Sequence, residues 1–232
     1  MLKQVFVPIN RAGWPFIAIF AAVTLGLWML SPWLGIFGVV LTLWCTYFFR
    51  DPPRVTPLRD GLVISPADGR IVMTETAEPP PELELGPGPW TRVAIFMNVF
   101  DVHVNRIPID GKVTRLAYKP GKFFNASLDK ASEHNERQSV RIETTDAAAG
   151  GATVGVVQIA GLVARRIKCN LVDGHRVVAG ERFGLIRFGS RVDVYLPPGV
   201  AIFAVVGQRA VAGETVLADF TATEGPRQGR TE

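Results

Sequence analysis

The hydrophobic positions of the chain follow two different patterns, and the change comes near residue 50. From Trp14 to Phe49 there are 36 consecutive residues without Asp, Glu, Lys or Arg. A straight helix of that length would be roughly 54 Å long, whereas the hydrocarbon core of a bilayer is about 30 Å thick. Ser31-Pro32 lies near the middle of the run, and proline disfavours a continuous helix there. The pattern therefore predicts two helical segments, residues 14–30 and 33–49, that form a membrane-associated hairpin, which either crosses the bilayer twice or dips in and returns.

The residues at the ends of this hairpin are typical of a membrane interface. Interfacial aromatic residues lie near the proposed segment ends: Trp14, Trp28, Trp33, Trp44 and Tyr47. Basic residues flank the run on both sides: Lys3, Arg11, Arg50, Arg54 and Arg59. Basic residues at both ends favour a cytoplasmic position for both. We therefore expect residues 1–49 to anchor the chain in the cytoplasmic membrane, with the rest on the cytoplasmic face; a hairpin in a soluble core is the alternative.

After residue 50 the chain consists of short alternating runs separated by Gly or Pro, a pattern typical of an all-β sandwich or barrel. The runs are residues 61–65, 70–74, 92–100, 111–118, 139–144, 153–159, 176–178, 191–196 and 201–206. Residues 78–89 are rich in Pro and Gly and predict a mobile loop, and residues 125–133 predict a short helix with Asn125 as N-cap. We expect one mainly β, lipoyl-like barrel or sandwich domain over residues 50–232.

Charge and cysteine content narrow the classes of function. The formal net charge of +4 suits an anionic membrane surface. No basic cluster is interleaved with aromatic residues, so nucleic acid is not an expected partner. Cys45 and Cys169 have neither metal-ligand nor redox spacing, which excludes a disulfide framework, and no metal is expected.

One hydroxyl interrupts the apolar face of the run around residue 190. In an extended chain every second side chain points to the same face, and the even-numbered positions here would face the core: Ile186, Phe188, Val192, Val194 and Leu196. Ser190 has the same parity, while the other parity holds Arg187, Arg191, Asp193 and Tyr195. Two interpretations of Gly189-Ser190 stay open. In one, Gly189 makes a bulge and the Ser190 hydroxyl bonds to backbone. In the other, the hydroxyl attacks the unobstructed Gly189 carbonyl, and elimination and hydrolysis leave a pyruvoyl group.

A series of short motifs resembles the short, prokaryotic type of phosphatidylserine decarboxylase, over nearly the whole chain. The motifs are Phe48-Phe-Arg-Asp-Pro-Pro-Arg54, Ser65-Pro-Ala-Asp-Gly69, Asp101-Val-His-Val-Asn-Arg-Ile-Pro108, Lys119-Pro-Gly121, Asn125-Ala-Ser-Leu-Asp-Lys-Ala-Ser132, Asn135-Glu-Arg137 and Arg187-Phe-Gly-Ser-Arg-Val-Asp193. Each motif is weak alone, but together and in this order they are specific.

The resemblance implies a self-cleaving enzyme that converts phosphatidylserine to phosphatidylethanolamine in phospholipid biosynthesis. It implies cleavage between Gly189 and Ser190 into a β chain of residues 1–189 and an α chain of residues 190–232, which stay together as a heterodimer. Ser190 would become the covalent pyruvoyl cofactor, which forms a Schiff base with the substrate amine. The expected partners are the phospholipid substrate in the bilayer and the membrane, and a higher homo-oligomer is left open.

The resemblance also assigns Asp68 and His103 as assisting catalytic residues. An imidazole can relay a proton to or from Ser190, and Asp68 could orient it. By spacing alone, His103 could be a hydrogen-bonded histidine at a barrel surface and Asp68 a turn residue.

The chain departs from longer family members in two places. They have Leu-Gly-Ser-Thr where this chain has Phe188-Gly-Ser-Arg191, and a second histidine where it has Arg106. Two other functions remain as alternatives: a membrane-tethered, non-catalytic lipoyl-like binding module, and a pyruvoyl decarboxylase acting on another amino-acid head group.

Overall fold

The computed structural model describes residues 7–121, 134–161, 166–187, 189–225 and 227–230. The chain divides into a smaller unit of Met1–Pro53 with Phe100–Val102 and a larger unit of Arg54–Val99 with His103–Glu232. The predicted helix at residues 125–133 and the orientation of Phe188 lie outside the described residues.

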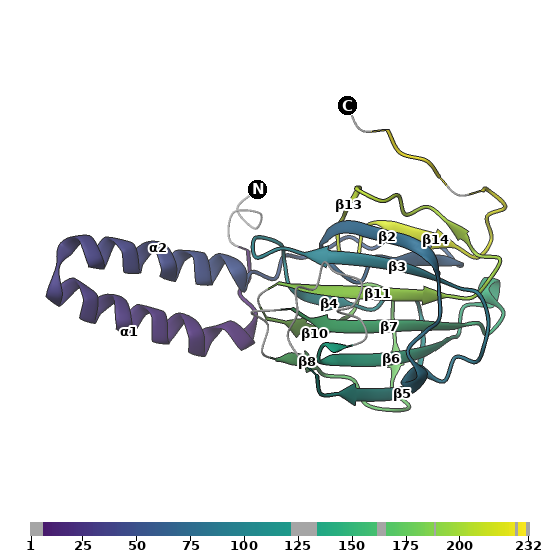
Figure 1. The fold of residues 1–232 in the computed structure, drawn as a ribbon, viewed down its shortest axis with the longest axis horizontal. Helices are drawn as coiled ribbons and strands as arrows, with labels where there is room; N and C mark the ends of the chain where they lie inside the picture. Colours follow the sequence, from purple (N-terminus) through teal and green to yellow (C-terminus); the bar gives the residue numbers. More distant parts are fainter. Residues whose placement is uncertain (1–6, 122–133, 162–165, 188, 226, 231–232) are drawn as a thin grey trace. The chain divides into compact units, whose positions relative to one another are not determined.

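The smaller unit is a helical hairpin (Figure 1). A short 3-10 helix, η2 (Arg11–Gly13), leads into α1 (Trp14–Leu30), and α2 (Pro32–Phe48) returns after an extended Ser31. This confirms the predicted hairpin, with one difference at its turn. The second helix begins at Pro32 rather than at residue 33, because a proline at the first helical position has a suitable φ and needs no hydrogen-bond partner for its nitrogen.

Small residues bring the two helices together. A Cβ added to Gly35 would lie 2.3 Å from the Trp28 ring, and one added to Gly38 would lie 2.8 Å from Thr24 Oγ1. The hydroxyls of Thr24 and Thr42 are 3.0 Å apart and form a hydrogen bond between the helices.

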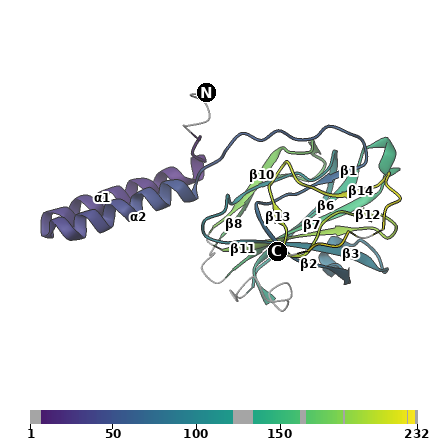
Figure 2. The same ribbon diagram turned by 90° about the horizontal axis from the view of Figure 1, so that it is seen from above.

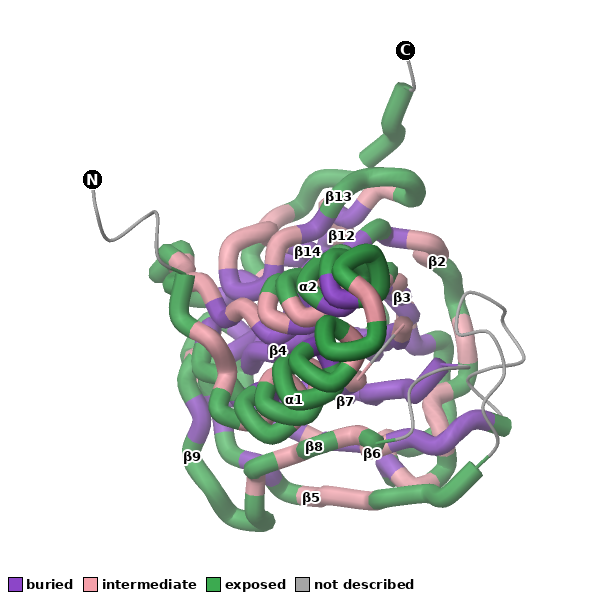
Figure 3. Tube along the Cα trace, turned by 90° about the vertical axis from the view of Figure 1, so that its left-hand side faces the viewer, coloured by how far each residue is buried: buried purple, intermediate pink, exposed green. Residues whose placement is uncertain are grey.

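The outward sides of the two helices carry large apolar side chains, with Met29 89% and Trp33 81% exposed. Figure 3 shows the hairpin mostly in the colour of exposed residues. Arg11–Leu30 is long and apolar enough to cross a membrane, and Pro32–Phe48 is a shorter apolar helix. Such a surface is unfavourable in water, and it is consistent with membrane association.

The larger unit is mainly β, and its principal sheet is a curled half-barrel (Figures 1 and 2). All neighbouring strands in it are antiparallel. The strands run in the order β13 (Arg209–Ala210), β2 (Gly69–Ala77), β3 (Trp90–Met97), β11 (Ser190–Leu196), β7 (Thr153–Ala160), β6 (Arg137–Thr144), β5 (Gly111–Lys119) and β9 (Arg176–Val177).

Two three-stranded sheets complete the unit. One has the order β1 (Leu62–Ile64), β14 (Val216–Asp219) and β12 (Ala201–Ile202), and the other β4 (Val104–Arg106), β10 (Arg182–Ile186) and β8 (Ile167–Cys169). Each of the nine predicted runs contains a strand, so the mainly β, barrel-like class is confirmed. The nine runs do not include β4, β8, β10, β13 and β14. These strands have two to five residues each, which gives little alternation for sequence reasoning to detect.

The central strand β11 is buried on both faces, in contrast to the apolar and polar faces that its alternation suggested. Val192, Val194 and Leu196 belong to the main core, as expected. The other parity is also buried: Arg191 and Asp193 form a bidentate ion pair with distances of 2.7 and 2.8 Å, and Tyr195 packs in a second apolar cluster.

Residues 78–89, predicted as a mobile loop, contribute to the second apolar cluster, which covers the Tyr195 side of β11. Within this segment lies a 3-10 turn, η3 (Pro81–Leu83), whose Leu83 is buried against Trp90, Val157 and Tyr195. Glu82 forms an ion pair with Arg137. Desolvation raises the pKa of the Glu82 carboxyl, but the hydrogen bond and charge of Arg137 outweigh it, so that the pKa is lowered. Apolar packing and this ion pair give the segment a defined place on the sheet.

Candidate active site

Ser190 is the first residue of β11 and is fully buried. In the sheet it lies opposite Met97 of β3 on one side and Ala160 of β7 on the other. Among the described residues, the only hydrogen-bond partner of its hydroxyl is the sulfur of Met97, at 3.9 Å. A thioether is a weak acceptor, so the hydroxyl is little stabilised in its protonated form.

Gly189 precedes it in a left-handed conformation, with φ +68°. A side chain at this position would meet no atom within 4 Å, but the backbone angle itself disfavours other residues. The peptide bond proposed for cleavage therefore joins a half-buried glycine, which has no side chain of its own to hinder attack on its carbonyl carbon, to a buried serine.

The structure brings His103 to this junction across 86 positions of sequence. The Gly189 N–H donates a long hydrogen bond, 3.4 Å, to Nε2 of His103. The His103 carbonyl accepts from Ile186 N–H at 3.3 Å, which ties residue 103 to the end of β10. His103 is fully buried, contrary to the alternative of a histidine at the barrel surface. With Nε2 as acceptor, the neutral ring carries its proton on Nδ1, and Nε2 is available as a base.

Asp68 is held in a buried turn. Its Oδ2 accepts from Arg54 Nη2 at 2.7 Å, and its Oδ1 accepts from the Ala212 N–H at 2.8 Å. The turn is joined to β4 by a hydrogen bond from Arg106 N–H to the Pro66 carbonyl at 2.9 Å. Asp68 thus lies in a turn bonded to the last residue of β4, the strand that begins directly after His103. Its two carboxylate oxygens accept hydrogen bonds from Arg54 and from the Ala212 N–H.

Arg106 occupies the position of the second histidine of longer family members. Its side chain is buried, and Nη1 donates to the Gly180 carbonyl at 2.7 Å. A guanidinium stays protonated and cannot act as a base near neutral pH. In this chain the position therefore has a structural hydrogen bond rather than an acid or base.

Sequence reasoning did not select two further buried polar residues near Ser190, Asn105 and Gln158. Gln158 Nε2 donates to Asn105 Oδ1 at 2.7 Å, and Asn105 Nδ2 lies 3.7 Å from the Met97 sulfur. A signal was present in each case: Asn105 shares the parity of His103, and Gln158 is the polar member of the core-facing series Val154, Val156, Gln158 and Ala160.

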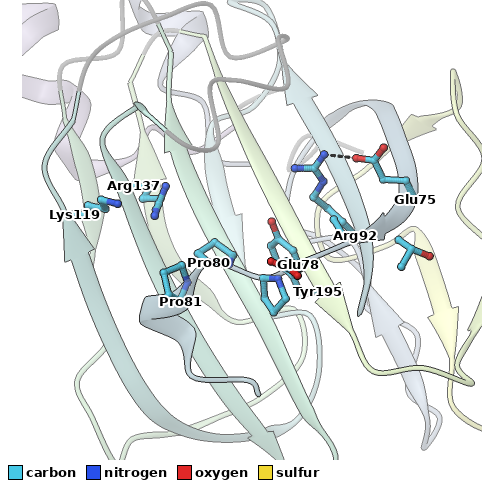
Figure 4. A pocket seen from close by; sticks show the side chains of 11 residues that line it. Glu75, Glu78, Pro80, Pro81, Arg92, Lys119, Arg137 and Tyr195 are labelled. Atoms are coloured by element: carbon cyan, nitrogen blue, oxygen red, sulfur yellow. Dashed lines mark hydrogen bonds and ion pairs between the residues drawn. The ribbon is translucent and has the colours of Figure 1, made fainter. Parts of the chain in front are cut away.

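A cavity of about 550 Å³ lies on the opposite face of the sheet (Figure 4). Its lining includes Tyr195 of β11, whose parity is opposite to that of Ser190. Burial and the Asp193 charge raise the pKa of the Tyr195 phenol. Two arginines that line the cavity already form ion pairs, Arg92 with Glu75 and Arg137 with Glu82. The cavity is therefore separate from the junction at Ser190. In the described part of the chain there is no cluster of three His, Cys, Asp or Glu residues that could hold a metal ion.

Comparisons with known proteins agree on one family. Residues 41–218 match the family model described as phosphatidylserine decarboxylase. A phosphatidylserine decarboxylase proenzyme of Paramagnetospirillum magneticum is 58% identical over 229 residues, which cover 99% of this chain and 94% of the relative. Proteins of the same name from Cereibacter sphaeroides and Xanthobacter autotrophicus are each 57% identical, over 99% and 98% of this chain and 97% and 95% of their own lengths. The chain belongs to the phosphatidylserine decarboxylase family.

Proposed function

We propose that this chain is a membrane-associated proenzyme that decarboxylates phosphatidylserine to phosphatidylethanolamine. Before it acts, it cuts itself between Gly189 and Ser190 into a β chain of residues 1–189 and an α chain of residues 190–232, which stay associated. The observation that carries the proposal is the contact of His103 Nε2 with the Gly189 N–H, beside a buried serine hydroxyl with only a thioether as partner. The relatives are named phosphatidylserine decarboxylase proenzymes, which agrees with processing.

Self-cleavage needs a base next to the serine, and His103 is the best placed candidate. It would take the Ser190 proton as Oγ attacks the Gly189 carbonyl carbon, and the peptide becomes an ester. An imidazole can accept this proton, because the ordinary pKa of histidine lies near neutrality. We assign Asp68 to support this step by orienting the His103 imidazole and stabilising the positive charge that develops on it.

The position of Ser190 fits a covalent pyruvoyl group. The residue is fully buried, has the core-facing parity, and neighbours apolar side chains of the main core. Such a group would supply a carbonyl that condenses with the substrate amine as a Schiff base and accepts the electrons released when carbon dioxide leaves. Scarce water around Val192 and Val194 favours loss of the carboxylate charge. His103 would then deliver a proton to the substrate carbon.

The hairpin would hold the catalytic unit at the bilayer that contains the substrate. Its exposed apolar surface suits hydrocarbon, and a chain held in the bilayer can meet a phospholipid that never leaves it. With both hairpin ends flanked by basic residues, we place the catalytic unit on the cytoplasmic face.

Intact-mass measurement of the purified full-length protein tests the proposal. We expect two chains that break after residue 189, with an α chain that carries a ketone and resists Edman degradation. An intact chain of 232 residues would instead support a non-catalytic binding module. An assay with phosphatidylserine and with other amino-acid head groups, each in bilayers, then identifies the substrate.

A further inference from the structure

The polar pair Asn105 and Gln158 lies beside Ser190 and has no part in the mechanism above. Both side chains are fully buried. Ser190 Oγ and Asn105 Nδ2 contact the same atom, the Met97 sulfur, at 3.9 and 3.7 Å. Met97 is also the residue directly opposite Ser190 in the ladder between β3 and β11. The amide nitrogen and the serine hydroxyl therefore share one hydrogen-bond acceptor.

The contacts determine which way the Asn105 amide faces. A thioether sulfur can only accept a hydrogen bond, so the atom that faces Met97 must be the amide nitrogen. The amide oxygen of Asn105 accepts from Gln158 Nε2 at 2.7 Å, which requires the same orientation. Gly184 leaves room for this arrangement, because a Cβ there would lie 2.8 Å from Gln158 Nε2. Gln158 thus holds the amide nitrogen of Asn105 toward the Met97 sulfur, the same atom that the Ser190 hydroxyl contacts.

Negative charge develops on Ser190 Oγ twice during the proposed self-cleavage. In the first step Oγ gives its proton to His103 and bonds to the Gly189 carbonyl carbon; the bond from that carbon to the Ser190 nitrogen breaks, and the nitrogen takes a proton. In the second step a base removes the Ser190 Cα proton and the Cβ–Oγ bond breaks. Its electron pair leaves on Oγ, now part of the Gly189 carboxylate. A fixed donor at this oxygen would assist both steps.

We propose that Asn105 is a catalytic residue of self-cleavage, donating an N–H to Oγ of Ser190, and that Gln158 is the positioning residue that holds it in this orientation. The inference rests on the proposed self-cleavage. The amide pair lowers the stability of the core, which supports a chemical role. Among the described residues, Gln158 Oε1 is buried without a hydrogen-bond partner. Apolar side chains would satisfy this part of the core better.

Two nearly isosteric substitutions test the pair in the full-length chain, synthesised in a cell-free system with liposomes and sampled over time for cleavage. Asn105→Asp replaces the donor that faces Ser190 by a carboxylate oxygen. Gln158→Glu removes the donor to Asn105 Oδ1, so that the Asn105 amide turns its nitrogen away from Ser190. We expect both to slow cleavage by about 10²–10³-fold, in the range found for loss of one such donor.

The matched control is Gln138→Glu, on the residue directly opposite Gln158 in β6, whose Nε2 donates to the Ser139 carbonyl. It should cleave at the wild-type rate. Hydroxylamine, which cuts esters, should not restore the rate of Asn105→Asp, because formation of the ester is itself slowed.

A further variant separates chemistry from folding. The double variant Asn105→Leu/Gln158→Met removes both members of the buried polar pair and leaves neither amide without its partner. It should unfold thermally at the wild-type temperature or above, yet cleave slowly. Wild-type cleavage rates in Asn105→Asp and Gln158→Glu would overturn the inference, as would slow cleavage that only accompanies a lower unfolding temperature. Failure of the wild-type chain to cleave would instead refute the proposed function.

Discussion

The Ser190 hydroxyl combines full burial with a weak hydrogen-bond partner, an arrangement that is costly in a core and useful in a nucleophile. His103 reaches the junction through its contact with the Gly189 N–H rather than through a contact with Oγ. His103 thus contacts the residue on one side of the Gly189–Ser190 bond, and the buried hydroxyl belongs to the residue on the other side.

Substitution of the nucleophile should stop maturation. Ser190→Ala is expected to remain a single inactive chain, because alanine has no atom that can form the ester. Ser190→Cys is expected to cleave slowly through a thioester, since a thiol occupies the same position and is nucleophilic. Denaturing gels and decarboxylase assays measure both results. Full activity of the alanine variant would remove Ser190 from the mechanism.

The two assisting residues should differ in their effects. His103→Ala is expected to impair cleavage and to lower turnover of the chains that mature by about 10²–10⁴-fold. Asp68→Asn should strongly slow self-cleavage and lower decarboxylase turnover less. The reason is that orientation by Asp68 matters most when a neutral serine must lose its proton. The cleaved fraction is measured by gel and turnover is normalised to pyruvoyl content.

His175→Ala serves as the control, since His175 is exposed in a turn. Normal turnover per pyruvoyl in the His103 variant would restrict His103 to maturation, and normal cleavage would show that another group activates Ser190.

At the scale of elements, β11 carries a fully buried ion pair immediately after the nucleophile. Removing one partner leaves an uncompensated charge, so Arg191→Met should destabilise the chain by about 3–5 kcal/mol. The double variant Arg191→Met/Asp193→Leu should recover most of this loss, because it buries no charge. Denaturant unfolding in a Ser190→Ala background, which keeps the chain in one piece, measures both.

The exposed ion pair of Arg227 with Glu224 is the control for the buried pair in β11. Arg227→Met should change the free energy of unfolding by only about 0–1 kcal/mol. An equally small effect of Arg191→Met would mean that water reaches the β11 pair.

The hairpin depends on close approach of its two helices at glycines. Gly38→Leu should separate them, because even a Cβ would lie 3.1 Å from Thr24 Cα. Gly26→Leu is the matched control on α1, where no atom lies within 4 Å of an added Cβ. Disulfide formation between Thr24→Cys and Thr42→Cys in bilayers, with Cys45 and Cys169 replaced by alanine, reports the approach. It should fall in the Gly38 variant alone; equal crosslinking in both would contradict the packing.

At the scale of the whole molecule, the four predicted site residues all belong to the larger unit: Asp68, His103, Gly189 and Ser190. Deletion of residues 1–49 should therefore release the protein from membranes and lower its activity on bilayer substrate, while self-cleavage persists. Membrane flotation, cleavage and assays with bilayer and detergent-dispersed substrate measure the three effects. A truncated chain that fails to fold would place the hairpin inside the core.

The amino-acid sequence by itself determined the elements whose pattern is long enough to be distinctive. The uncharged run with Ser31-Pro32 at its middle could only be two helices, and the alternating runs after residue 50 predicted strands. The junction Gly189-Ser190 and its assisting residue His103 were identified through the resemblance of their motifs to a known family, since spacing alone left a structural explanation open for both. Strands as short as β4 and β10 have no such signal and form because neighbouring strands complete their hydrogen bonds.

Only the tertiary structure decided what surrounds each residue. Arg191 and Asp193 have the alternation of a solvent-facing pair, yet a second layer over β11 buries them together. Asn105 and Gln158 are 53 positions apart, and only the pairing of β4 with β10 and the packing of β10 against β7 bring their amides into contact. Periodicity reports which side of a strand a residue occupies, whereas burial and hydrogen-bond partners depend on what the rest of the chain places there.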